Sequence, residues 1–280
     1  MPPDAGGSAD PIDVPGRGVH SVEIAGRILA ALAEAGGPIM LRDLAQMAAV
    51  TPAQAHAYVV SLRRLGLVEQ EGGRYALGPF ALTLGIARLR TFNPLRMAAT
   101  AIDDIVTRTG LMATVSVWGT HGPTVVQVQE PRDNLHVNIR PGIVYSIGGS
   151  ATGRAFAAFL PEDIVTPRVR AELDEGQDSQ RIGNPISEAQ LAREVKQIRR
   201  AGFATARGSP IPGINALAAP VFDYTGLVQF VLTEIGAAAD VDTSLESPQA
   251  AELLALTRDL SARLGYTQVG ARGFAQWPGP

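Results

Sequence analysis

The spacing of apolar residues differs between the two parts of the chain. Between residues 21 and 109 they recur mainly at steps of three and four, as on one face of a helix. From Met112 onward several stretches alternate between apolar and polar residues, as in strands. With 280 residues, the chain is long enough for two domains. The pattern therefore predicts a helical N-terminal domain and a C-terminal domain of the α+β class.

The N-terminal pattern predicts a winged helix-turn-helix domain over residues 20–79. One helix runs from Ser21 until Gly36 stops it, and two more are expected at residues 41–48 and 52–65. Thr51 is suited to cap the third helix, and Pro52 to its first position. Two short β-prone runs follow, joined by the hairpin signal Gly72-Gly73. Three helices and a hairpin in this order are typical of a winged helix-turn-helix.

The rest of the chain divides into a helical linker at residues 80–109, a mixed domain at 110–266 and a tail at 267–280. Alternation predicts antiparallel strands at residues 112–118, 125–129, 135–139, 215–222 and 227–235. Helices are expected at residues 151–160, 188–201 and 248–264. Residues 1–19 hold four Pro and four Gly, which predicts a disordered leader.

The third predicted helix has a face suited to reading DNA. We expect an inward stripe of Ala55, Val59, Leu62 and Leu65, and an outward stripe of Gln54, Ala57, Ser61 and Arg64. Gln54 could pair with an adenine edge, and Arg64 could hold a phosphate. Arg74 lies where the hairpin would reach the neighbouring backbone. The alternative is that the same module serves packing or protein contacts.

The charge distribution limits how the chain could bind DNA. A sequence pI of about 5.8 excludes a protein that coats nucleic acid through bulk charge. Residues 21–90 hold seven Arg and five acidic groups, a net charge of +2, whereas residues 96–280 hold 16 basic and 19 acidic groups, or −3. Affinity is therefore expected to come from dimerisation, which doubles the DNA contacts.

A Gly-rich turn at residues 148–155 suggests a binding function rather than catalysis. As a phosphate-binding loop it has Arg154 in place of Lys and Ala155 in place of Ser/Thr. As a nucleophile elbow around Ser150 it has Thr152 where Gly is needed. The free N–H groups of a helix that starts here would suit a carboxylate, although a plain helix cap is the simpler interpretation.

Other residue types exclude several functions. The chain has no Cys, so disulfides, zinc fingers of the Cys type and thiol nucleophiles are ruled out. Its four His have no metal-ligand spacing, and we expect no metal, no cofactor and no catalytic residue. No apolar run approaches a membrane span, so we expect a cytoplasmic protein without a membrane partner.

Several segments together resemble the IclR (isocitrate lyase regulator) family of bacterial transcription factors. The resemblance covers roughly residues 21–264 and rests on the order and spacing of these segments rather than on any one of them. They are Leu41-Arg42-Asp43-Leu44-Ala45, Ala55-His56 with Tyr58, Leu65-Gly66-Leu67-Val68, Arg74-Tyr75-Ala76-Leu77-Gly78, Ala151-Thr152-Gly153-Arg154-Ala155-Phe156, and the run from Gly213 to Asp223.

The resemblance implies a ligand-controlled regulator, a repressor or activator of a catabolic operon. It implies a winged helix that binds double-stranded operator DNA as a dimer or tetramer, and a GAF-like domain that binds a small organic effector, a carboxylate or an aromatic compound. The residues then expected at DNA are Arg42, Thr51, Pro52, Ala53, Gln54, Ala57, Tyr58, Ser61, Arg64 and Arg74. Those expected at the effector are Ser150, Ala151, Thr152, Gly153, Ile214, Ala216, Thr233 and Ile235.

Two departures from the family pattern bear on function. Ala57 stands where a basic residue is usual, so one DNA contact is missing. Ala206, Ala216 and Ile235 stand where polar residues often line the ligand site, which predicts an apolar pocket and argues against short keto acids. Arg207 could supply a counter-charge, although a surface position is the simpler expectation. An enzyme with a fused helical domain and a protein-binding scaffold are the alternatives.

Overall fold

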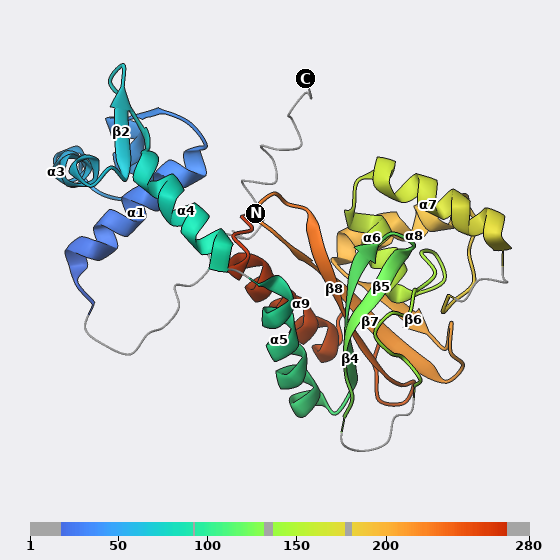
Figure 1. Ribbon diagram of the computed structural model, residues 1–280. Helices are drawn as coiled ribbons and strands as arrows, with labels where there is room; N and C mark the ends of the chain where they lie inside the picture. Colours follow the sequence, from blue (N-terminus) through green and yellow to red (C-terminus); the bar gives the residue numbers. More distant parts are fainter. Residues whose placement is uncertain (1–17, 92, 132–136, 177–180, 268–280) are drawn as a thin grey trace, which may run out of the picture. The chain divides into compact units, whose positions relative to one another are not determined.

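The computed structural model describes residues 18–91, 93–131, 137–176 and 181–267. They form two compact units, of which the first ends at Thr91 and the second begins at Phe92. Most of the predicted leader and all of the predicted tail after residue 267 lie outside the described residues. Figure 1 shows the helices and strands of each unit. Each unit has its own hydrophobic core.

The first unit is a helix-turn-helix with a hairpin. Its elements are α1 (His20–Ala35), β1 (Ile39–Met40), α2 (Leu41–Met47), α3 (Pro52–Arg64), β2 (Val68–Glu71), β3 (Arg74–Leu77) and α4 (Pro79–Thr91). The three strands form an antiparallel sheet in the order β1-β3-β2. Apolar side chains of the first three helices, such as Ile28, Leu44 and Val59, share one core with Tyr75 of the hairpin. The predicted fold of this domain is confirmed.

Local sequence explains where α3 begins and ends. Thr51 accepts a hydrogen bond from the Gln54 N–H at 3.2 Å, and Pro52 occupies the first turn, where no N–H is needed. Ala55, Val59 and Leu62 are buried as predicted. The prediction for Leu65 is wrong, because this side chain is 62% exposed. The helix ends at Arg64, the chain turns at the left-handed Gly66 (φ 72°), and Leu67 rather than Leu65 packs against the core.

The second unit is a mixed domain built on one sheet. Its elements are α5 (Pro94–Thr109), β4 (Met112–Gly119), β5 (Gly122–Gln129), α6 (Ala151–Phe159), α7 (Glu162–Glu175), α8 (Glu188–Ala201), β6 (Ala204–Arg207), β7 (Ile214–Phe222), β8 (Val228–Ala237) and α9 (Pro248–Arg263). The strands pair antiparallel in the order β5-β4-β8-β7-β6. This confirms the predicted α+β class.

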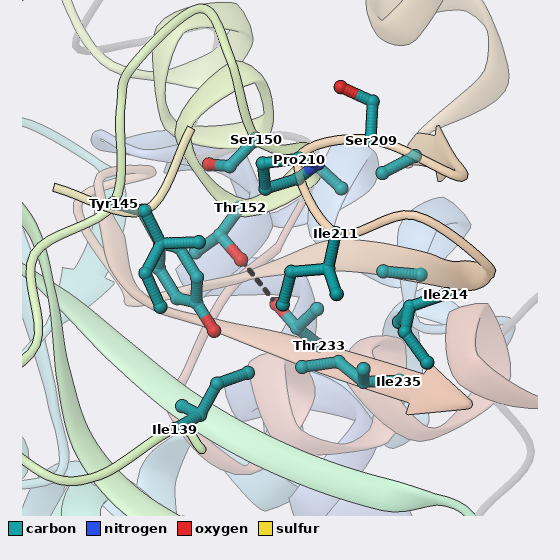
Figure 2. Close-up of a pocket in the computed structure, with 14 residues that line it drawn as sticks. Ile139, Tyr145, Ser150, Thr152, Ser209, Pro210, Ile211, Ile214, Thr233 and Ile235 are labelled. Atoms are coloured by element: carbon teal, nitrogen blue, oxygen red, sulfur yellow. Dashed lines mark hydrogen bonds between the residues drawn. The ribbon is translucent and has the colours of Figure 1, made fainter. Parts of the chain in front are cut away.

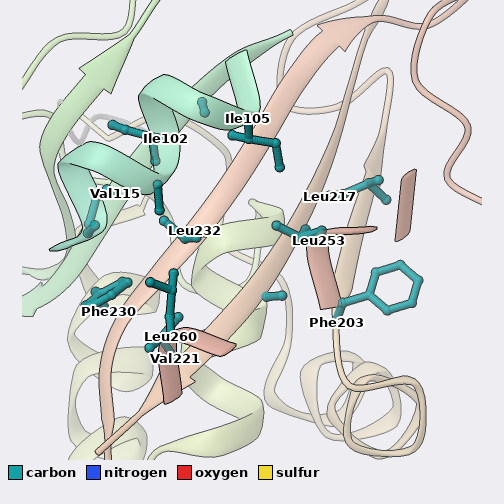
Figure 3. Close-up of a cluster of buried hydrophobic side chains, with 14 of the residues drawn as sticks. Ile102, Ile105, Val115, Phe203, Leu217, Val221, Phe230, Leu232, Leu253 and Leu260 are labelled. Carbon is teal, nitrogen blue, oxygen red and sulfur yellow. The ribbon is translucent and has the colours of Figure 1, made fainter. Parts of the chain in front are cut away.

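Helices cover both faces of this sheet. On one face α5 and α9 pack on Leu217, Phe230 and Leu232 (Figure 3). On the other face α6 packs, with α7 and α8 joining the same cluster (Figure 1). Successive side chains of β8 therefore point to opposite faces of the sheet. Those of Thr233 and Ile235 face the α6 side.

The sequence prediction misplaced one strand and omitted three elements. Residues 132–136 of the predicted strand 135–139 lie outside the described residues, and Val137 to Ile139 form no strand. Ile139 instead donates its N–H to the Val137 carbonyl at 2.7 Å, a tight turn that buries both side chains. The omitted elements are β1, β6 and α7. The two strands are short, and α7 contains Pro167 and many charged residues.

A candidate DNA-binding helix and a candidate effector pocket

The outward face of α3 presents the predicted stripe to solvent. Gln54, Ala57, Ser61 and Arg64 are all exposed, and so are the flanking residues Thr51, Pro52 and Ala53. Tyr58 is half-buried and packs against the core of the first unit. This face carries one amide, one hydroxyl and one guanidinium, which are groups that bind base edges and phosphates.

Gln54 also caps its own helix, which the sequence prediction did not foresee. Its side-chain oxygen accepts the Thr51 N–H at 3.1 Å, and Thr51 accepts the Gln54 N–H in return. This reciprocal capping box fixes the start of α3. The amide nitrogen of Gln54 is not used in the cap, so a contact with DNA would have to share the side chain with the cap.

Two further arginines were predicted to contact DNA, Arg42 on α2 and Arg74 on β3. Arg42 and Arg74 are exposed, and Arg74 donates weakly to the Pro38 carbonyl at 3.5 Å. Arg74 follows the Gly72-Gly73 turn of the hairpin, where Glu69 and Glu71 on β2 are also exposed. With one basic and two acidic side chains, the wing has a net charge of −1, which agrees with the low positive charge of this domain.

A pocket lies on the α6 side of the second unit's sheet, between the start of α6 and strands β7 and β8 (Figure 2). Its cavity volume is about 30 Å³. That is room for roughly two water molecules. The lining residues are Ile139, Tyr145, Ser150, Ala151, Thr152, Ile182, Ala206, Ser209, Pro210, Ile211, Ile214, Ala216, Thr233 and Ile235.

Seven of the eight residues predicted at the effector line this pocket. Only Gly153 does not, because its Cα packs against the backbone of Ser146 and Ile147, where a side chain would overlap their carbonyl oxygens. The predicted apolar lining by Ala206, Ala216 and Ile235 is also present. The turn and the two strands, far apart in sequence, thus meet at one place.

The start of α6 leaves hydrogen-bond donors at the pocket. Ser150 caps the helix by accepting the Gly153 N–H at 2.9 Å, and its carbonyl accepts the Arg154 N–H. The N–H groups of Ala151 and Thr152 find no acceptor among the described residues. The Thr152 hydroxyl is 2.8 Å from that of Thr233, which joins α6 to β8 across the pocket. These donors and the helix dipole favour an oxygen-bearing or anionic group.

A buried carboxylate fixes the turn that leads into α6. Glu172 of α7 accepts hydrogen bonds from the Ser146 hydroxyl and, at 2.9 Å, from the Ile147 N–H. Arg181 lies 3.8 Å from the same carboxylate. Because Ser146 also receives the Gly149 N–H, the Gly-rich turn is held from α7. Glu172 thus positions the pocket's polar end.

The guanidinium groups near the pocket bind to groups outside the pocket. Arg154 donates to the carbonyls of Gly148 and Thr205 and lies 2.9 Å from Glu194. Arg207 donates to the Thr243 hydroxyl at 2.7 Å, as expected for a surface position rather than a counter-charge. The pocket lining contains no Lys, Arg, His, Asp or Glu among the described residues.

Sequence reasoning missed six of the fourteen residues of the pocket wall. Tyr145, Ile182 and the segment Ser209-Pro210-Ile211 lie in connections without a hydrophobic period. One available signal was the polar residue Thr114 on the strand β4, which is fully buried and opposite Thr233. Polar residues at buried strand positions indicate a lined cavity or a hydrogen-bond network.

Comparison with known proteins identifies the family to which both domains belong. Residues 21–72 match the IclR helix-turn-helix domain, and residues 87–262 match the C-terminal domain of bacterial transcriptional regulators of the IclR type. The chain belongs to the IclR family. This makes it a DNA-binding transcriptional regulator and not an enzyme, as the sequence predicted.

Members of the IclR family resemble the chain over most of its length. The probable HTH-type transcriptional regulator ArcR of Halobacterium salinarum is 28% identical over 228 residues, which are 79% of this chain and 82% of that protein. The transcriptional repressor IclR of Escherichia coli is 23% identical over 201 residues, 70% of this chain and 72% of that protein. The crystal structure of Pseudomonas aeruginosa HmgR has a TM-score of 0.77 and 34% identity, covering 89% of this chain and 100% of that one.

The helices were also compared with the length and apolar character that a membrane span needs. Among the residues that the structure describes, no helix combines the length and apolar character needed to cross a bilayer.

Proposed function

We propose that this regulator is controlled by a small organic effector, a carboxylate or an aromatic compound, bound in the pocket at the start of α6. The observation that carries the proposal is the convergence of Ser150, Thr152, Ile214, Thr233 and Ile235 on one cavity beside unused N–H groups. An effector bound there would bias the placement of two winged helices on operator DNA. We propose that the regulated genes form a catabolic operon. The protein would act in the cytoplasm, because the operator DNA lies there.

We also propose that the chain works as a dimer or tetramer whose copies meet through α4. Large apolar side chains of this helix are exposed: Phe80 43%, Leu82 67%, Leu84 49% and Ile86 41%. A helix with so much exposed apolar surface favours burial against a second copy. Dimerisation would also supply the second half-site contact that a domain of net charge +2 requires.

A DNA-retardation assay tests the proposed control. The probe is the promoter fragment next to the regulator's own gene, at low salt, with benzoate, phenylacetate or pyruvate added as trial effectors. We expect retardation, and a shift of roughly 5- to 100-fold in DNA affinity with an accepted effector. Absence of any retarded band would contradict the DNA partner proposed here.

The variant Ala216→Phe separates the pocket from the DNA-binding surface. Ala216 lines the pocket, so a phenyl ring there should fill the cavity. We expect DNA binding to persist and the effector response to disappear. Ala239→Phe, at an exposed position of the same domain, is the matched control and should respond normally. An unchanged response in Ala216→Phe would place the effector elsewhere.

A further inference from the structure

A groove lies between α7 and α8 of the second unit, apart from the pocket at the start of α6. Residues of α7 between Glu162 and Val169 and of α8 between Glu188 and Arg199 line it, together with Ala157 of α6. Its cavity volume is about 300 Å³, which is in the range of small-molecule sites. The α7/α8 groove and the pocket share no lining residue.

Most of the lining of the α7/α8 groove is aliphatic. The residues with aliphatic side chains are Ala157, Val165, Val169, Leu191, Ala192 and Val195. The two valines of α7 are four positions apart, as are Leu191 and Val195 of α8, so each helix turns one stripe of branched side chains to the groove. From Glu188 to Lys196 the lining follows α8 for about 12 Å. An aliphatic surface of this length fits an extended alkyl chain.

The two ends of the α7/α8 groove differ in charge. Arg170 of α7 lies 3.2 Å from Glu188 of α8, so the end of α7 meets the start of α8 and the charges there cancel. The start of α7 therefore meets the end of α8, where Glu162, Lys196 and Arg199 line the groove. Neither Glu162 nor Lys196 forms an ion pair within the described residues. This second end has two cations and one anion, a net charge of +1.

Lys196 is the only lysine of the chain, whose other 23 basic residues are arginines. Arg199 beside it donates from Nε to the Ala158 carbonyl at 2.6 Å, which holds this guanidinium at the end of α6. The Lys196 side chain is exposed and has no partner among the residues that the structure describes. A lysine can lay its alkyl stem along an apolar surface and direct its charge to an anion. These two cations are thus placed to bind a carboxylate at one end of the aliphatic lining.

We propose that the α7/α8 groove is a second ligand site, which binds an unbranched aliphatic monocarboxylate. The alkyl chain would lie along the aliphatic lining, and the carboxylate would bind Lys196 and Arg199. An aliphatic amine would meet the same two cations and be repelled. A short acid would leave most of the aliphatic surface uncovered and gain little from its burial. The site is separate from the effector pocket proposed above and does not depend on it.

Calorimetric titration of the full chain tests the charge and the length of the ligand. The probes are sodium octanoate, sodium butanoate and octylammonium chloride. Octanoate has four more methylene groups than butanoate, so we expect it to bind roughly 100-fold more tightly. Octylammonium has a similar chain with the opposite charge, and we expect it to bind about tenfold more weakly than octanoate. Because Lys196 is the only lysine, NMR of the chain labelled with carbon-13 lysine reports on this side chain alone, and its signals should shift with octanoate.

Variants at exposed positions of α8 locate the ligand without disturbing the core. Lys196→Gln should weaken octanoate binding about fivefold and leave binding of neutral 1-octanol unchanged, whereas loss of a purely structural contact would weaken both. Arg193→Gln removes the same charge from an exposed position outside the groove and should have no effect. Ala192→Phe should fill the groove and abolish octanoate binding. Ala216→Phe fills the pocket at the start of α6 and should leave octanoate binding intact.

Several results would overturn the inference. They are no octanoate binding at about 10 mM, equal affinity for octanoate and octylammonium, an unchanged octanoate affinity in Lys196→Gln, and loss of binding in Ala216→Phe but not in Ala192→Phe. If the wild type bound no octanoate and Ala192→Phe changed the oligomeric state in light scattering, the groove would be an interface between copies instead. None of these results concerns DNA, so the retardation assay tests the proposed function separately.

Discussion

At the scale of single residues, Glu234 is the least expected side chain in the second unit. It is 2% exposed in β8, and neither carboxylate oxygen has a hydrogen bond within the described residues. Burial, and then repulsion from Glu252, raise its pKa to about 7, while Arg108 acts in the opposite direction. Arg108 and Glu252 form an ion pair of 2.8 Å between α5 and α9. Glu234 thus titrates between the sheet and these two helices.

The stability of the protein should therefore decrease as pH rises from about 4.5 to 7. An acid whose pKa is raised by folding binds its proton more tightly in the folded state, so stability is full below the unfolded value and lost through the folded one. The loss would be about 2 to 3 kcal/mol. Glu234→Gln should remove it, raising the free energy of unfolding at pH 8 but not at pH 4.5. Urea unfolding at both pH values measures this, and a variant with the wild-type pH profile would contradict it.

Glu234 also shows why alternation alone misleads at the residue scale. In an alternating strand a charged residue is usually assigned to solvent, but here α5 and α9 cover one face of the sheet and α6 the other. Which faces are covered depends on helices far away in sequence. The burial of the Thr114 and Tyr145 side chains could not be foreseen for the same reason.

At the scale of elements, Gln54 caps α3 and is the residue that we predict to contact a base. Gln54→Ala removes half of the capping box and should lower the free energy of unfolding by about 0.5 to 1 kcal/mol. It should also relax the preference at one base position. Arg64→Ala should leave stability unchanged and weaken binding to all sequences, as loss of a phosphate contact does. Affinities for a set of single-base operator variants distinguish the two substitutions. If Gln54→Ala and Arg64→Ala changed these affinities in the same way, the outward face of α3 would be assigned wrongly.

Elements with strong local signals were predictable, and those fixed by distant contacts were not. Thr51-Pro52, Asn93-Pro94 and Ser187 mark helix starts with caps that depend on adjacent residues alone. The short strand β6 exists because β7 pairs with it. Half of the pocket wall, including Ile211, belongs to connections whose position only the assembled sheet defines.

At the scale of the whole molecule, weak charge and an exposed α4 point to the same requirement. The acidic overall pI averages a first unit of slight positive charge with an acidic second unit. With so little positive charge per copy, we expect useful affinity to require two linked copies on two half-sites, as proposed above. The exposed apolar residues of α4 provide a surface for that linkage.

Leu82→Glu should therefore uncouple the copies without unfolding them. Leu82 is 67% exposed, so the change should cost at most about 0.5 kcal/mol of folding stability, whereas a carboxylate in an apolar interface opposes association. Light scattering should show a dimer or tetramer for the wild type and a monomer for the variant. Affinity for a two-half-site operator should fall by about 100-fold or more, and affinity for a single half-site should not change. Leu245→Glu, at a Leu that is 69% exposed in the second unit, controls for added charge. If Leu82→Glu stayed dimeric and bound the full operator normally, α4 would not be the interface.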